Sequence, residues 1–348
     1  ADGTTAIGYQ AGQILTSGIG STAVGYQALV SATDNDYNTA VGARALYSIS
    51  GSSGTEGENN TAIGRYAGYN NTTGVSNVYV GGAAGYANTI GNYNNFIGQS
   101  AGNSLVDGTN STYIGWYAAY NQTHGDNNVV VGHQALYGSS GKGDISSTVA
   151  IGYQSAYKAE AGYGITAVGS RALRNITPSG SLSTAIGYFS GFNASGSYNT
   201  FVGADAGRGG TTSAPFSSGE YNVAVGYQSL DAFTTGFRNV GVGKDTLGLL
   251  TTGQKNTAIG DEAFFTLGKG NYSVAVGAAA GYYATGSYNT FMGYEAGKGG
   301  TSSAPHSSGE YNTAIGYNAL KGFTTGHENT VMGYQAAYSL TSADNNVI

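Results

Sequence analysis

The segment Asn312-Thr313-Ala314-Ile315-Gly316-Tyr317-Asn318-Ala319 decides the fold, because its pattern recurs along all 348 residues of the chain. Nineteen glycines occupy the place of Gly316, and most are 17 residues apart. They are Gly8, Gly25, Gly42, Gly64, Gly81, Gly98, Gly115, Gly132, Gly152, Gly169, Gly187, Gly203, Gly226, Gly243, Gly260, Gly277, Gly293, Gly316 and Gly333. A short fixed period predicts a repeat protein in which each copy stacks on the next.

Each repeat contains a strand signal, which we describe by counting positions from the anchor glycine. Position −1 is Ile or Val in seventeen copies and Met in two, while position −3 is Thr in twelve and Val in six. Examples at position −1 are Ile7, Val24, Val41, Ile63 and Ile315. β-Branched residues two apart favour extended backbone and share one face of a strand. We therefore predict a short strand with positions −3 and −1 in the interior. Position −2, which is usually Ala but sometimes Tyr or Phe, is expected to face solvent or a neighbouring chain.

Two further positions complete the predicted coil. The anchor glycine is expected to turn the chain in a conformation closed to residues with a Cβ, and the small residue at position +3 is expected to enter a narrow interior. Position −4 is Asn in twelve copies, among them Asn38, Asn60, Asn77, Asn199, Asn222 and Asn312. Stacked coils would align these amides into a hydrogen-bonded ladder. The pattern predicts an all-β, single-stack parallel β-solenoid of about nineteen coils.

A second period of 90 residues overlies the first. The sequence around Tyr198-Asn199-Thr200-Phe201 recurs as Tyr288-Asn289-Thr290-Phe291. The longest coils end at Gly64, Gly226 and Gly316, and we expect them to project inserted loops near 48–59, 208–220 and 298–310. Because the motif runs in phase to both ends, we interpret residues 1–348 as one continuous repeat domain and as a segment of a longer array.

Composition excludes several classes of protein. The chain has 60 Gly, 29 Tyr and no Cys, and only 9% of its residues are charged. The formal charge is −6 and the 13 Lys and Arg residues are scattered, so we expect no nucleic-acid partner. Apolar runs are too short to span a membrane. Without Cys, disulfides and thiolate metal sites are excluded, and we expect no cofactor.

The motif resembles a known family. Ser273-Val274-Ala275-Val276-Gly277-Ala278-Ala279-Ala280 and residues 312–319 are similar to the S/N-V-A-I-G-x-x-A repeats in the heads of YadA-like trimeric autotransporter adhesins. Related repeats also occur in phage tail fibres and large bacterial surface proteins. The resemblance implies a left-handed parallel β-roll and a homotrimer around an axis. It also implies an extracellular, cell-surface or virion location.

Candidate chemical sites are few. Tyr follows the anchor in eight copies, including Tyr26, Tyr227 and Tyr317, and such rows either pack between coils or stack on sugars or proteins. The four His residues, His124, His133, His306 and His327, are far apart and show no metal-ligand spacing. Carboxylates such as Asp34 and Asp36 are interpreted as solvated turns. No nucleophile, base and orienting group recur together, so the chain is not expected to be an enzyme.

These observations favour a non-enzymatic structural fibre segment that self-associates and acts as a rigid spacer. The alternative is a fibre or adhesin tip that binds a host-surface protein or glycan through its inserted loops and Tyr rows. Ice binding is disfavoured, because the recurrent Thr shares its face with Ile or Val residues that we place inside.

Overall fold

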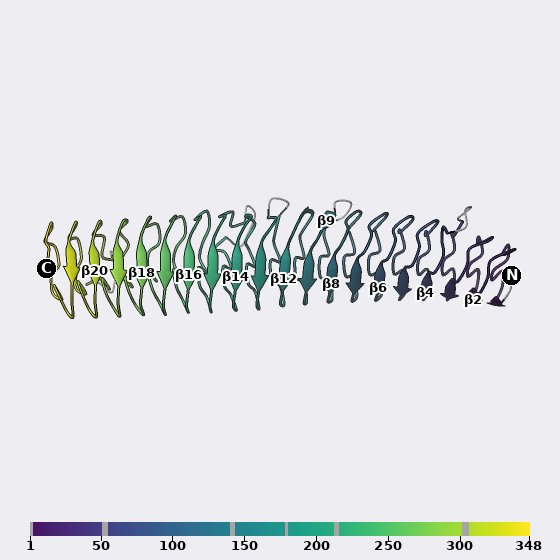
Figure 1. The fold of residues 1–348 in the computed structure, drawn as a ribbon, viewed down its shortest axis with the longest axis horizontal. Helices are drawn as coiled ribbons and strands as arrows, with labels where there is room; N and C mark the ends of the chain where they lie inside the picture. The colour runs from purple at the N-terminus through teal and green to yellow at the C-terminus, as the bar shows by residue number, and fades with distance from the viewer. Residues whose placement is uncertain (1–2, 51–54, 140–142, 178–179, 212–215, 301–305) are drawn as a thin grey trace. The chain divides into compact units, whose positions relative to one another are not determined.

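A three-residue strand precedes every anchor glycine in the computed structural model, which describes residues 3–50, 55–139, 143–177, 180–211, 216–300 and 306–348. These nineteen strands cover positions −3 to −1, as the sequence predicts, and no helix is present in the described residues. The chain divides into unit 1, Ala1–Pro178, and unit 2, Ser179–Ile348. Within each unit the strands lie side by side in chain order (Figure 1).

Unit 1 contains ten of these strands in parallel pairing. They are β1 (Thr5–Ile7), β2 (Thr22–Val24), β3 (Thr39–Val41), β4 (Thr61–Ile63), β5 (Val78–Val80), β6 (Asn95–Ile97), β7 (Thr112–Ile114), β8 (Val129–Val131), β10 (Val149–Ile151) and β12 (Thr166–Val168). A separate two-stranded sheet joins β9 (Asp144–Ser146) to β11 (Ala161–Tyr163). Pairing is in register, so that Thr22, Ala23 and Val24 lie beside Thr39, Ala40 and Val41.

Unit 2 repeats the arrangement with nine strands. They are β13 (Thr184–Ile186), β14 (Thr200–Val202), β15 (Val223–Val225), β16 (Val240–Val242), β17 (Thr257–Ile259), β18 (Val274–Val276), β19 (Thr290–Met292), β20 (Thr313–Ile315) and β21 (Thr330–Met332). Each is parallel to the next and in register with it, including β14 and β15, whose connection contains an inserted loop. Each unit is therefore an all-β parallel solenoid in which equivalent positions form straight rows.

The interior is occupied by position −2, not by positions −3 and −1. Ala23, Ala40 and Ala62 have no exposed surface, whereas Ile7 is 60% exposed and Ile63 is 44% exposed. The prediction that Ile7, Val24, Val41, Ile63 and Ile315 point inward is therefore wrong by one residue. Successive residues of a β-strand point to opposite faces, so an error of one residue exchanges the buried face and the exposed face of the whole sheet.

Aromatic residues at position −2 are buried by a compensating change at position +4. Phe201 and Phe291 are fully buried, and each lies against a glycine at position +4 of its own coil. A Cβ built on Gly207 would lie 2.1 Å from Phe201 Cδ1. In the coils of Ala23 and Ala40, position +4 is Leu29 or Leu46, also fully buried, whereas Ala62 is followed at position +4 by Gly68, which lies against Tyr79 of the next coil. Pairing small with large keeps the interior filled at a nearly constant cross-section.

The anchor glycine meets two constraints at once. Gly25 has φ +133°, a region that L side chains rarely adopt. A Cβ on Gly25 would also lie 2.7 Å from the carbonyl oxygen of Gly42 in the next coil. The φ angle agrees with the turning role predicted for the anchors. The short distance to Gly42 shows that the anchor must also lack a side chain because successive turns stack closely.

The small-with-large pairing predicts a rescue. Phe201→Ala should lower the free energy of unfolding by about 3–5 kcal/mol through a cavity, and Gly207→Leu alone should lower it by at least about 1–3 kcal/mol through overpacking. The double variant has the Ala and Leu pair of other coils and should recover most of the loss. Urea denaturation followed by circular dichroism measures all three, and a double variant no more stable than Phe201→Ala would contradict the pairing.

Candidate functional site

The outward face of the main sheet runs through all the paired coils of each unit. It presents positions −3 and −1, which across the nineteen copies are Thr, Val, Ile or Met with the single exception of Asn95, so the face carries no charged side chain. Ile97 and Ile114 in unit 1 are 39% and 37% exposed, and Ile186 and Ile259 in unit 2 are each 42% exposed. Rows of partly exposed β-branched side chains thus cover the outward face of the main sheet in each unit.

Threonine hydroxyls on this face differ from those elsewhere in the coil. Thr72 and Thr89 donate to the carbonyl oxygens of Thr89 and Val106 in the next coils, at 3.1 Å each. Among the described residues, no hydrogen bond from the side chain of Thr22 or Thr39 is found, and both residues lie partly exposed on the sheet face. An external Thr array does exist, so the sequence argument against it is wrong.

The predicted asparagine ladder is present inside the coils. Asn60 Nδ2 donates to the Gly74 carbonyl at 2.9 Å, and Asn60 Oδ1 accepts from the backbone N–H of Asn77 at 3.0 Å. Asn77 repeats both bonds with Gly91 and Asn94. Asn38, Asn199, Asn222 and Asn312 make the same pair of bonds in their own coils. Each side chain therefore satisfies two backbone groups of the next coil.

Serine replaces asparagine in some coils and keeps the bond to the backbone N–H of the next coil, and Ser21 Oγ also donates to the Asn35 carbonyl at 3.3 Å. Ser21 Oγ accepts from the N–H of Asn38 at 3.1 Å, and Ser111 Oγ accepts from the N–H of Asn128 at 3.2 Å. Both serines are fully buried. The short hydroxyl keeps the row continuous across coils that lack the amide.

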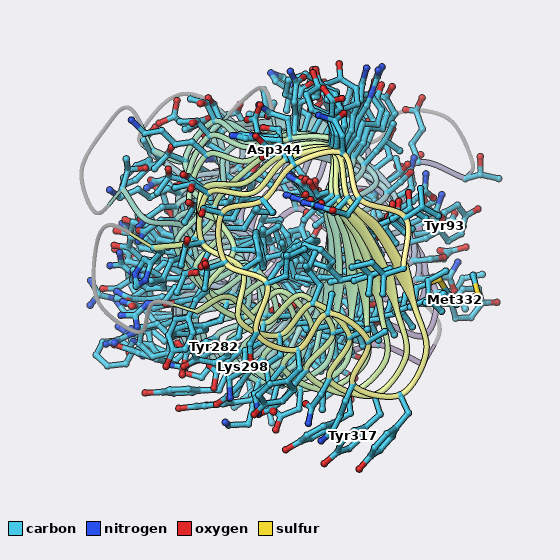
Figure 2. The ribbon with its side chains drawn as sticks, turned by 90° about the vertical axis from the view of Figure 1, so that its left-hand side faces the viewer. Tyr93, Tyr282, Lys298, Tyr317, Met332 and Asp344 are labelled. Carbon is cyan, nitrogen blue, oxygen red and sulfur yellow. The ribbon has the colours of Figure 1, made fainter. Side chains whose placement is uncertain are left out.

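The tyrosines at position +1 form exposed stacks at the end of the sheet. Tyr26 stacks on Tyr9 with ring centroids 5.5 Å apart, and Tyr317 lies between Tyr294 and Tyr334 at 5.3 and 5.4 Å. Figure 2 shows Tyr317 in a group of rings that point away from the coil. Neighbouring rings cover the faces that a sugar would need. Tyr227 is 49% exposed, and no described ring stacks on it.

A second aromatic row lies at position +5, which the sequence reasoning missed. Tyr69 lies between Tyr47 and Tyr86 at 5.0 and 5.2 Å. Further along unit 1, Tyr137 lies between Tyr120 and Tyr157. The recurrence of Tyr five residues after the anchor was the signal that could have revealed this row.

Ion pairs are concentrated in unit 2. Glu295 is nearly buried between Lys298 and Lys321, with a nitrogen–oxygen distance of 2.5 Å to each. Burial alone would raise the pKa of Glu295, but hydrogen bonds from the two ammonium groups lower it below its usual value. Lys244 lies 2.9 Å from Asp245 and 3.6 Å from Glu262. The pairs of Glu295 with Lys321 and of Lys244 with Glu262 join neighbouring coils, whereas the other two lie within one coil.

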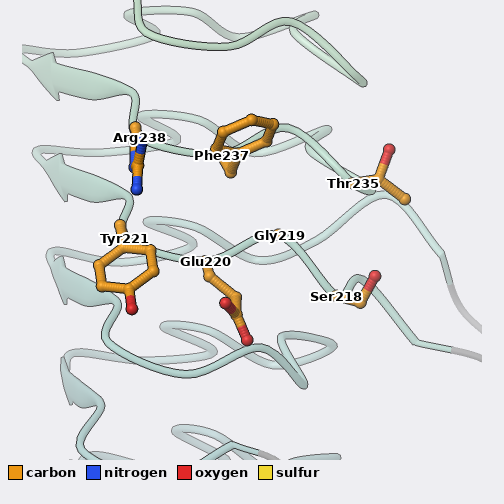
Figure 3. A pocket seen from close by; sticks show the side chains of 7 residues that line it. All are labelled: Ser218, Gly219, Glu220, Tyr221, Thr235, Phe237 and Arg238. Atoms are coloured by element: carbon orange, nitrogen blue, oxygen red, sulfur yellow. The ribbon is translucent and has the colours of Figure 1, made fainter.

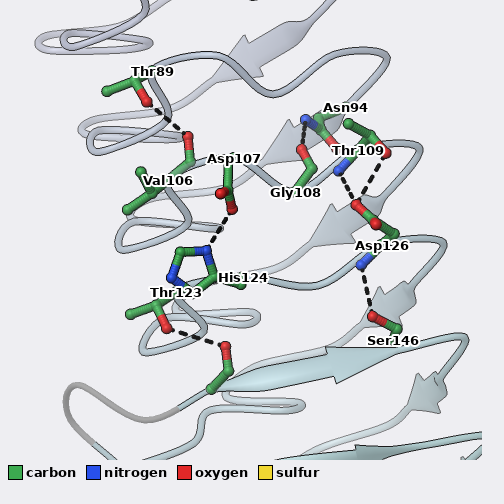
Figure 4. A network of polar contacts seen from close by, with 11 residues as sticks. Thr89, Asn94, Val106, Asp107, Gly108, Thr109, Thr123, His124, Asp126 and Ser146 are labelled. Atoms are coloured by element: carbon green, nitrogen blue, oxygen red, sulfur yellow. Dashed lines mark hydrogen bonds and ion pairs between the residues drawn. The ribbon is translucent and has the colours of Figure 1, made fainter.

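The polar network around His124 joins successive turns (Figure 4). His124 Nδ1 lies 2.5 Å from Asp107 Oδ1, and both side chains are largely exposed. Asp126 Oδ1 accepts from the N–H and hydroxyl of Thr109 at 2.7 and 3.0 Å. No group of three His, Asp or Glu residues that could hold a metal ion is found in the described parts of the chain. His133 stacks between Trp116 and Tyr153, and His306 stacks on Tyr283.

A shallow hollow lies along one edge of unit 2, between the coils that end at Gly226 and Gly243 (Figure 3). Tyr221 and Arg238 line it, with the guanidinium 5.6 Å from the ring centroid, and Glu220 lies beside them. The hollow is open to solvent and offers charge and an aromatic edge. Its lining holds no pairing of a nucleophile with a base.

The inserted loops near 48–59, 208–220 and 298–310 lie partly outside the described residues. Their described flanks bond to neighbouring coils, as Gly210 does through its N–H to the Phe233 carbonyl at 2.7 Å. Gly300 repeats this bond with Phe323. The flanks therefore follow the repeat on both sides of each insertion.

Comparison of the chain with protein-family models and with curated proteins finds no match. In the described residues, no helix is long and apolar enough to cross a membrane.

The two-bond role of asparagine predicts graded losses. Asn77→Ala leaves the buried Asn94 N–H and Gly91 carbonyl without partners and should lower the free energy of unfolding by about 2–5 kcal/mol. Asn77→Ser keeps the bond to the N–H, as Ser21 and Ser111 do, and should cost roughly half as much. Urea denaturation of the two variants checks this order. Equal stability of both variants would show that the ladder contributes little.

Proposed function

We propose that the chain is a non-enzymatic structural segment of an extracellular fibre, on a cell surface or a virion, in which copies associate as a homotrimer and hold other parts at a distance. Support comes from the coils, which bond mainly to their neighbours through repeated backbone and Asn contacts. Such stacks extend by addition of coils and are stiff. The similarity of the repeat motif to the head repeats of YadA-like adhesins also supports this proposal.

The observation that carries the association is the outward sheet face. Ile97, Ile114 and Ile259 expose more than a third of their surface within rows that carry no charge. Regular exposed apolar surface of this extent marks an interaction site in soluble proteins. Burial of β-branched side chains against those of another copy is favourable at about 25 cal/mol per Å² of apolar area.

Association through this face predicts that the wild-type chain sediments as a trimer. Ile97→Lys combined with Ile114→Lys places two charges on the face and should shift the protein to monomers, because charges are costly in an apolar interface. Gln99→Lys is the matched control, since Gln99 is exposed at position +1, beyond the sheet face. Sedimentation equilibrium measures the masses.

A monomeric wild-type protein would refute the association. If that monomer also produced thermal hysteresis, the exposed rows of Thr hydroxyls and methyl groups would instead be assigned to ice binding.

A second candidate is recognition of a glycan or host-surface protein, and Tyr227 favours it because its ring is exposed and unstacked. Tyr227→Ala should weaken binding to a glycan identified on an array by about threefold to tenfold. Tyr317→Ala removes a ring that is covered on both sides and should leave binding unchanged. Equal effects of both variants, or no glycan bound, would contradict this role for Tyr227.

A further inference from the structure

The hollow beside Arg238 has a counterpart 90 residues later in the chain. Five of its seven lining residues recur unchanged, and they are Ser218, Gly219, Glu220, Tyr221 and Thr235, which correspond to Ser308, Gly309, Glu310, Tyr311 and Thr325. The other two differ, since His327 stands in the place of Phe237 and Glu328 in the place of Arg238. The two copies therefore share a framework and differ in the chemistry that they present.

Two backbone donors that are occupied in the second copy are open in the first. The N–H of Glu310 donates to His327 Nδ1 at 3.0 Å, and the N–H of His327 donates to Asp344 Oδ1 at 2.7 Å. Among the described residues, no acceptor is found for the N–H of Glu220 or of Phe237. Both residues line the hollow. A backbone N–H that no protein group occupies is available to a bound acceptor.

Aromatic contacts hold the guanidinium at this hollow. The guanidinium carbon of Arg238 lies 5.6 Å from the ring centroid of Tyr221 and 5.9 Å from that of Phe237. Such contacts orient a cation and leave its N–H donors available. Tyr198 stacks on Tyr221 at 4.8 Å, whereas no described ring stacks on the partly exposed Phe237. The hollow therefore combines guanidinium donors with an unstacked ring.

Arg238 is the first of three cations on this edge of unit 2. Residues 233–239, 250–256, 267–273 and 283–289, which precede β16 to β19, contain Arg238, Lys255 and Lys269 but no Asp or Glu. In the described residues, no carboxylate lies within ion-pair distance of Arg238 or Lys255. Figure 3 shows the Glu220 carboxylate pointing away from the coil of Arg238. The positive charge of this edge is therefore not paired within the described chain.

We propose that the hollow and the cations beside it bind an acidic glycan, with a carboxylate or sulfate group of the sugar on the Arg238 guanidinium and the open backbone N–H groups. Ionised acceptors make the strongest hydrogen bonds to such donors. The Phe237 ring can pack on the apolar face of a sugar, and the exposed Ser218 and Thr235 can bond to its hydroxyls. Lys255 lies one coil further on, about 4.8 Å along the stack, and can meet the acidic group of a second sugar.

Other polyanions match this surface less well. Three cations are few for nucleic acid, whose binding depends on neutralising many phosphates, and the chain carries a formal charge of −6. An acidic peptide supplies carboxylates, but not the apolar face bordered by hydroxyls that Phe237, Ser218 and Thr235 complement. The site also goes beyond the proposed structural role, because it requires neither association of copies nor Tyr227, which lies after the strand at position +1.

The second copy supplies the matched variant for the experiment. Phe237→His with Arg238→Glu gives the hollow the residues that the other copy carries on the same framework. This variant should bind a hexagalacturonate about tenfold or more weakly than the wild type at about 0.1 M salt. The reciprocal change, His327→Phe with Glu328→Arg, should add a second, weaker site. Isothermal titration calorimetry measures affinity and stoichiometry, and circular dichroism verifies that each variant is folded.

Single substitutions separate the charge from the framework. Arg238→Gln should weaken binding of hexagalacturonate by about threefold to tenfold, because it removes a charged donor. Glu328→Gln removes a charge at the same position of the other copy and should change affinity by less than about twofold. Raising the salt to about 1 M should weaken binding by the wild type and leave little difference between it and Arg238→Gln.

The choice of probe tests the class of ligand. A heparin hexasaccharide measures whether sulfate serves in place of carboxylate, and tighter binding of either acidic sugar than of neutral maltohexaose supports the site. Failure of both acidic sugars to bind, or affinity for hexagalacturonate unchanged in Phe237→His/Arg238→Glu, would overturn it. Equal affinity for hexaglutamate would show recognition of charge alone and would likewise refute a glycan site.

This binding and the association of copies can fail independently. Ile97→Lys/Ile114→Lys changes the sheet face of unit 1 and should leave the affinity for hexagalacturonate within about twofold of the wild type. A loss of affinity in that variant would place the site at the association interface and contradict the independent hollow.

Discussion

In-register stacking of one coil on the next is the constraint on which the rest of the structure depends. The asparagine at position −4 enforces it, since its amide accepts from one backbone group of the next coil and donates to another. These bonds are buried, where an unmade bond costs most. A shift of one residue would break both at once. The cross-section of the interior, the course of the turns and the alignment of surface residues all follow from this register.

Much of this register could be predicted from the sequence, because its signals are local. The anchor glycines, the strand before each anchor and the asparagine ladder correspond to residue types with one dominant use. Which positions of the strand point into the interior could not be predicted in the same way. Val24 and Ile63 look like core residues by hydrophobicity, yet the solenoid interior between the sheet and the turns is narrow, and Ala23 and Ala62 fill it. The alternation of methyl and aromatic groups at position −2 suggested an outward face. That alternation is compatible with a buried face because position +4 also changes between coils, from Leu29 in the coil of Ala23 to Gly207 in the coil of Phe201.

Stacking also converts sequence position into surface geometry. Residues 17 apart become neighbours, so a preference at one repeat position becomes a row. Stacked tyrosines illustrate a consequence of this rule, because Tyr317 between Tyr294 and Tyr334 presents its edge and hydroxyl in place of its face. Aromatic abundance in such a chain therefore does not translate into sugar-stacking platforms. Recognition by stacking requires a break in the row, as at Tyr227.

Charges follow the same rule with a different result. A sequence with 9% charged residues has no evident charge pattern, yet every Asp and Glu described in unit 1 lies at positions −9 to −6, and every described Lys and Arg lies at positions +1 to +6. In unit 2, Lys244 lies 3.6 Å from Glu262 and Glu295 lies 2.5 Å from Lys321, so these charges pair across neighbouring coils. Repeat position therefore decides where a charge lies on the coil, and the residue at the same position of the next coil decides whether that charge is paired across coils, as Glu295 is with Lys321.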